Sequence, residues 1–116
     1  MTETRYEIRI TADALADIQA IQDYLRDAGA DAVAHDFLDK VMARVAPLET
    51  FPLLGSVPKE FADLSVLDFR QIVMPPYRIL YEVIGARVEI MLVTDDRRDM
   101  QSLIREFLMK HPPRRQ

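Results

Sequence analysis

The sequence contains no cysteine, and this absence removes several kinds of chemistry at once. Without thiols the chain can form no disulfide framework, no thiolate metal site and no cysteine nucleophile. It also lacks any apolar run near the roughly 20 residues that span a bilayer. Residues 1–10 are charged from the third position and show no apolar core of a signal peptide. We therefore expect a cytoplasmic protein with no membrane segment.

The charge of the chain is acidic in total and uneven along its length. A net charge of −4 argues against a surface that coats nucleic acid, because that mode of binding needs many cations. Residues 1–63 hold 12 acidic and 6 basic side chains, whereas residues 64–116 hold 7 acidic and 9 basic ones. Any polyanionic ligand is expected to contact the second half.

The size and composition are typical of one compact globular domain. The chain has 116 residues, of which 49% are hydrophobic and 29% charged, and it shows no repeat or low-complexity segment. We predict a single domain over residues 1–110. Residues 111–116, HPPRRQ, are predicted to form a flexible tail.

The first half predicts a strand followed by a helical hairpin. Residues 5–10 alternate apolar and charged side chains, which is typical of a half-buried strand. Thr11 suits the N-cap of a first helix and Gly29 its left-handed end. Asp31 opens a second helix, which Pro47 ends or kinks. Each helix is about 17 residues long, and their short connection predicts antiparallel packing.

The second half predicts an antiparallel meander and a last helix. Residues 49–66 contain prolines and a glycine without any period, which indicates a packed irregular loop. Gly85 suits the first central position of a type II′ hairpin turn. A helix is expected to start at Asp95 or Asp96. Three strands are predicted before it, over residues 67–74, 77–84 and 87–94. The fold class is therefore α+β, with a helical hairpin packed on an antiparallel sheet.

Four arginines in the second half are the candidate binding residues: Arg70, Arg78, Arg97 and Arg98. They can form a functional basic patch, or they can lie on the solvated face of the sheet and pair with Glu82 or Glu89 across strands. Tyr77 and Tyr81 share one strand face, where packing is a commoner role than stacking on bases.

The acidic and histidine residues give no clear metal or acid–base site. Asp95, Asp96 and Asp99 lie where a helix is predicted to begin, and there carboxylates cap free amides and meet the positive end of the dipole. His35 and His111 have no visible partner that would make either a general base. We expect no metal and no cofactor.

The order of several segments resembles the RelE/ParE superfamily of toxins from bacterial type II toxin–antitoxin systems. The similar segments are TADALADIQAIQDYL, PLETFPLLG, RQIVMPPYRILYEVIGARVEIMLV and RRDM, which together cover most of the chain. The resemblance implies a toxin that a cognate antitoxin binds in a hetero-oligomer. It also implies one of two mechanisms, because some members cleave mRNA on the ribosome and others poison DNA gyrase.

For the nuclease mechanism, the resemblance assigns catalytic arginines to Arg78 and Arg97. The positions of the two lysines of RelE-like nucleases fall on Phe69 and Gln71, and the position of their tyrosine falls on Leu103. These replacements weaken the case for a metal-independent endoribonuclease, although enzymatic activity stays open at this point.

The alternative is a ParE-like toxin, which binds gyrase rather than cutting RNA. The long helical hairpin and the acidic charge favour this branch, since a protein target suits an acidic toxin better than ribosomal RNA does. Arg70, Arg78, Arg97 and Arg98 would then contact the target. A third reading is a non-toxic relative that only binds its antitoxin and helps to repress the operon.

Overall fold

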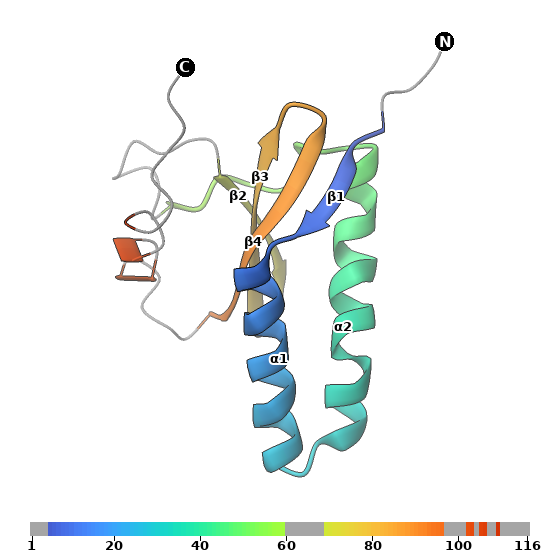
Figure 1. The fold of residues 1–116 in the computed structure, drawn as a ribbon, viewed down its shortest axis with the longest axis vertical. Helices are drawn as coiled ribbons and strands as arrows, with labels where there is room; N and C mark the ends of the chain where they lie inside the picture. Colours follow the sequence, from blue (N-terminus) through green and yellow to red (C-terminus); the bar gives the residue numbers. More distant parts are fainter. Residues whose placement is uncertain (1–4, 60–68, 97–101, 104, 107–108, 110–116) are drawn as a thin grey trace.

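A computed structural model describes residues 5–59 and 69–96, together with residues 102, 103, 105, 106 and 109. Its elements follow the predicted order of a strand, two helices and three strands (Figure 1). They are β1 (Glu7–Ile10), α1 (Ala12–Asp27), α2 (Asp31–Val45), the 3-10 turn η1 (Ala46–Glu49), β2 (Phe69–Met74), β3 (Tyr77–Ile84) and β4 (Arg87–Asp95). The predicted α+β class is confirmed.

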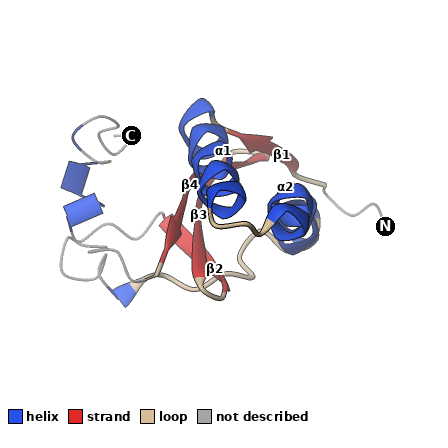
Figure 2. Cartoon of the chain, turned by 90° about the horizontal axis from the view of Figure 1, so that it is seen from below, coloured by secondary structure: helices blue, strands red, loops and turns tan. Residues whose placement is uncertain are grey.

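The four strands form one sheet in the order β1-β4-β3-β2. The last three strands are an antiparallel meander, as predicted, while β1 joins it by parallel pairing with β4. This order makes β1 and β2 the two edge strands. The helices form a hairpin on one side of the sheet, and its connected end extends beyond the sheet (Figures 1 and 2).

The core lies between the helical hairpin and one face of the sheet. The ring of Phe37 on α2 meets that of Tyr77 on β3 edge to face, at a centroid distance of 5.0 Å. Tyr81 is fully buried in the same layer, which confirms the packing role predicted for both tyrosines. The buried cluster consists of Ala14, Ile18, Phe37, Val41, Val45, Leu48, Ile72, Ile79, Tyr81, Val88, Ile90 and Val93.

The helix boundaries agree with the residues predicted to set them. The side chain of Thr11 accepts a hydrogen bond from the Ala14 amide at 3.2 Å, so Thr11 is the N-cap of α1. Gly29 has a φ of 81°, in the left-handed region that favours glycine. α2 begins at Asp31 and ends at Val45, and Pro47 belongs to the 3-10 turn after it.

Thr11 also joins the helical layer to the sheet, so its removal has a measurable cost. Its hydroxyl donates to the Ile90 carbonyl at 2.8 Å while it caps α1. We expect Thr11→Ala to lower the free energy of unfolding by about 1–2 kcal/mol. Thr11→Ser keeps the hydroxyl and should lose less than half as much in denaturant titration. Equal losses in the two variants would contradict this role.

One predicted boundary is wrong, and another shifts by a single residue. The irregular loop predicted over residues 49–66 starts after Glu49, which belongs to the 3-10 turn η1, and within its described residues Ser56 forms an isolated bridge with Gln71. The last helix does not begin at Asp95, because this residue continues β4 and pairs with Tyr77. The amide of Asp96 donates to the Pro76 carbonyl at 2.8 Å, so it too belongs to the end of the sheet.

The predicted last helix lies largely outside the described residues. The five described residues there, at positions 102, 103, 105, 106 and 109, have helical backbone. The predicted tail, residues 111–116, falls outside the description entirely. In the part of the chain that is described, no helix has the length and apolar character needed to cross a membrane.

Candidate functional site

Arg70 and Arg78 lie on opposite faces of the sheet and do not form one patch. In the β2–β3 pairing, Arg70 is opposite Tyr81 and Arg78 is opposite Val73. Opposed residues point to the same face, and successive residues alternate between faces. Arg70 therefore shares the helix-covered face with Tyr81, whereas Arg78 lies on the other face. Arg97 and Arg98 are outside the described residues.

Arg78 lines a cavity on the face of the sheet away from the helices. Its Nε donates a hydrogen bond to Gln71 Oε1 at 2.7 Å, which orients the guanidinium from the neighbouring strand. The cavity has a volume of about 380 Å³. Its lining comes from the segment before β2, from β2 and β3, and from the end of β4: Lys59, Gln71, Val73, Arg78 and Asp96.

The charges around this cavity suit the binding of a polar ligand group. Lys59 and Arg78 are cationic and Asp96 is anionic. The two cations suit a carboxylate or phosphate of a ligand, and Asp96 suits a hydrogen-bond donor beside it. Gln71 is occupied in accepting from Arg78. Phe69, the other position of the nuclease lysines, is only 3% exposed. A buried phenyl ring and an engaged carboxamide supply no proton-transfer group.

Sequence reasoning did not place Lys59 and Asp96 at this site. Lys59 follows a segment without periodicity, so no pattern indicates where its side chain lies. Asp96 was interpreted as a helix cap, whereas its backbone bond to Pro76 holds it beside the β2–β3 turn. Together with this bond, the pairing of β3 with β4, which extends to Asp95, brings Asp96 to the cavity that Arg78 lines.

Arg70 has a different role, because its guanidinium holds the segment before β2. Nη1 donates to the Gly55 carbonyl at 2.8 Å and, in a longer contact of 3.4 Å, to that of Leu53. Arg70 thus bonds to main-chain carbonyls rather than to Glu82 or Glu89 as the alternative reading expected. The Tyr81 hydroxyl completes this clamp by donating to the Pro52 carbonyl at 2.8 Å and accepting from the Gly55 amide at 2.8 Å.

The buried hydroxyl of Tyr81 should make the stability depend on alkaline pH. Burial raises the pKa of Tyr81, and the Gly55 amide and the charge of Arg70 oppose that rise without cancelling it. The folded protein therefore retains the phenol proton at pH values where the unfolded chain has lost it. The stability that this phenol contributes is therefore fully present below a pH of about 10, and it is lost as the pH rises from there through the pKa of the folded state.

Urea titrations at about pH 9 and about pH 11 can measure this dependence. Other tyrosines and the lysines also titrate there, so Tyr81→Phe is the matched control. We expect the variant to be less stable at pH 9 but to lose less stability than the native protein between the two pH values. A loss as steep in the variant as in the native protein would contradict the role of Tyr81.

The described residues contain no group of three or more histidine, cysteine, aspartate or glutamate side chains placed to hold a metal ion. This result does not test the expectation that the whole protein works without a metal, which stays a prediction.

Comparison with known proteins supports the resemblance seen in the sequence. Residues 8–100 match the family described as "ParE toxin of type II toxin-antitoxin system, parDE". No curated protein matches the chain. Among solved structures, the fold is similar to a chain of the "Chromosomal ParDE TA system from P. aeruginosa", with a TM-score of 0.66 and 19% sequence identity. The similarity covers 79% of this chain and 97% of the other.

Proposed function

The chain belongs to the ParE toxin family of type II toxin–antitoxin systems, and from this premise we propose that it inhibits bacterial growth by binding DNA gyrase. A cognate antitoxin neutralises it in the cytoplasm by forming a hetero-oligomer. In this proposal the toxin acts by binding, and Arg78 with its cavity contacts the target. Arg97 and Arg98, which come two and three residues after the end of β4 at Asp95, are proposed to contact the target as well.

The observation that carries this proposal is the contact between Arg78 and Gln71. An RNA-cleaving site needs groups that activate the ribose 2′-hydroxyl and protonate the leaving oxygen. Gln71 instead accepts a hydrogen bond from Arg78, and Phe69 is buried. An arginine makes charge-assisted hydrogen bonds to carboxylates on protein targets without any proton transfer. Binding therefore explains the site better than proton transfer does.

The antitoxin is proposed to lie along the helical hairpin and an edge of the sheet. The hairpin exposes several apolar side chains, namely Leu15, Tyr24, Val33 and Met42. Apolar helix faces and open strand edges are the two surfaces that a disordered partner segment commonly covers when it folds on binding.

Inducing the protein alone in bacteria tests the proposal against its two rivals. We expect growth arrest with gyrase-dependent DNA breakage and intact ribosome-bound mRNA. Cleaved mRNA without DNA breakage would replace the proposal with a ribosome-dependent endoribonuclease. Normal growth with antitoxin still bound would indicate a relative that acts only in antitoxin binding and operon repression.

A further inference from the structure

The outer edge of β2 is only partly covered by the rest of the described chain. Ser56 pairs with Gln71 through both backbone groups, with N···O distances of 3.1 and 2.8 Å. Leu54 would be the next residue to pair with this edge, opposite Val73, but its amide donates a hydrogen bond to the Phe51 carbonyl instead. Backbone groups in an antiparallel strand alternate between its two sides, so those of Val73 point to the same edge as those of Gln71. The pairing stops one step short of Val73.

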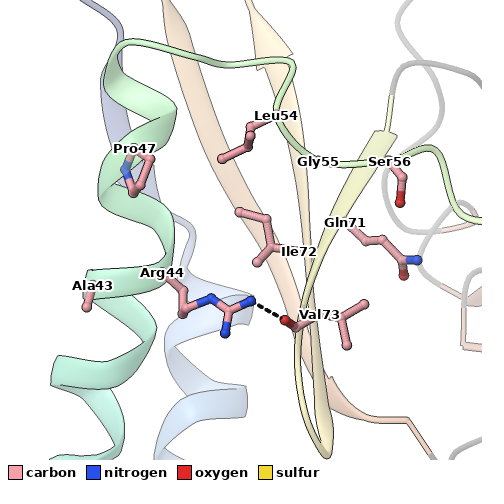
Figure 3. A pocket seen from close by; sticks show the side chains of 9 residues that line it. All are labelled: Ala43, Arg44, Pro47, Leu54, Gly55, Ser56, Gln71, Ile72 and Val73. Atoms are coloured by element: carbon pink, nitrogen blue, oxygen red, sulfur yellow. Dashed lines mark hydrogen bonds between the residues drawn. The ribbon is translucent and has the colours of Figure 1, made fainter.

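The two backbone groups of Val73 differ in how they are satisfied. The guanidinium of Arg44, from the C-terminal part of α2, donates to the Val73 carbonyl (Figure 3). Among the described residues, none accepts a hydrogen bond from the Val73 amide. The edge thus offers one free donor beside a carbonyl that a side chain covers.

A cleft of about 460 Å³ lies alongside this edge. It is bounded by the end of α2, the segment before β2 and β2 itself, with Leu54 and Ile72 between them (Figure 3). Leu54 is 60% exposed and Val73 42% exposed. Their exposed apolar surface, next to an open strand edge, is what a strand from another chain can cover.

The charge at the cleft indicates which kind of strand fits. Arg44 is exposed and, within the described part of the chain, forms no ion pair. An incoming antiparallel strand would donate its own amide to the Val73 carbonyl and release the guanidinium. A carboxylate on that strand could then receive Arg44 in a charge-assisted pair, whereas a lysine there would be repelled.

We propose that the Val73 edge of β2, the adjacent cleft and Arg44 form a docking site for an extended, acidic segment of the antitoxin. The identity of the partner rests on the proposed function, whereas the geometry of the site does not. In the free protein Arg44 closes the edge; in the complex it pairs with a carboxylate of the added strand. The apolar side chains of that strand cover Leu54 and Val73.

Two synthetic peptides with blocked ends test this site without the antitoxin. One alternates valine with glutamate and the other alternates valine with lysine. We expect the native protein to bind only the glutamate peptide, with new hydrogen-exchange protection of the Val73 amide. Failure of the glutamate peptide to bind, or protection confined to β1, would overturn the proposal. This assay needs no toxic activity, so a failure of the gyrase proposal would leave its result unchanged.

Variants at two positions make the test specific. Arg44→Glu should weaken the glutamate peptide at least about tenfold and should favour the lysine peptide. Val73→Pro removes the outward donor and leaves the pairing with β3 possible, so it should also weaken binding while thermal unfolding stays cooperative. If both variants bind the glutamate peptide as the native protein does, the site is wrong. If Val73→Pro instead abolishes a dimer of this chain, the edge serves self-association and the proposal is likewise overturned.

Discussion

Replacing Arg78 by alanine is expected to abolish growth inhibition while the protein stays folded and bound to its antitoxin. Arg78 lines the cavity on the open face of the sheet, and Gln71 orients its guanidinium. If the side chain is central to the target interface, its truncation should cost about 2 kcal/mol or more of binding free energy. That cost corresponds to an affinity roughly 30-fold lower.

Two further variants separate this effect from a general loss of charge. Arg87 on β4 lies on the same face of the sheet as Arg78 and pairs with Glu89 at 3.1 Å. Arg87→Ala should therefore leave toxicity unchanged. Arg78→Lys keeps the charge but loses the planar fork of donors, so it should restore toxicity only in part. Full toxicity of Arg78→Ala, or equal loss in Arg87→Ala, would show that this cavity does not contact the target.

The largest effect on stability is expected from Gly55→Ala. An added Cβ would lie 2.5 Å from the carbonyl oxygen of Gln71 and 2.7 Å from the Tyr81 hydroxyl. The first neighbour is main chain held in the sheet, so it cannot move without disturbing β2. We expect the free energy of unfolding to fall by about 3 kcal/mol, as for a forced insertion into a packed interior. Denaturant unfolding followed by circular dichroism measures this loss.

Two controls show whether the close contact is the cause. Ser56→Ala changes an exposed neighbour and keeps the backbone bridge to Gln71, so it should alter stability by less than about 0.5 kcal/mol. In a Tyr81→Phe background, Gly55→Ala should cost somewhat less, because one of its two closest contacts is gone. A native-like stability of Gly55→Ala in the wild-type background would show that the segment before β2 packs loosely.

The sequence predicted the elements whose signals are local. Thr11, Gly29 and Pro47 mark helix ends through cap chemistry and fixed backbone angles, and each lies where it was expected. The fold class follows because these elements have few ways to bury their apolar faces.

Arg70 and Arg78 do not form the predicted shared patch, because the register of the β2–β3 hairpin places them on opposite faces of the sheet. A two-residue turn at Pro75 and Pro76 places Met74 opposite Tyr77, so Val73 opposes Arg78. Arg70 is an odd number of residues from Val73 and must point to the other face. This signal was present in the sequence, since the length of the turn fixes the register.

Other parts of the site could not be predicted because they depend on contacts between distant segments. The positions of Gly55 and the carbonyl of Pro52 are fixed by the Tyr81 hydroxyl, 26 and 29 residues away. Lys59, four residues after Gly55, lines the cavity. Asp95 was predicted to cap a helix from its local sequence, but its backbone pairs with Tyr77 on β3 and it ends strand β4. Pairing between strands can override the local preference of a single residue.

Purified gyrase gives the most direct test of the central claim, that the toxin acts by binding gyrase rather than by cutting RNA. Supercoiled plasmid is incubated with gyrase and the protein, and the DNA is analysed after denaturation of the enzyme. We predict cleaved plasmid that requires both proteins and is lost with Arg78→Ala but not with Arg87→Ala. No gyrase-dependent cleavage, together with mRNA cleavage on purified ribosomes that Arg78→Ala abolishes, would contradict the account.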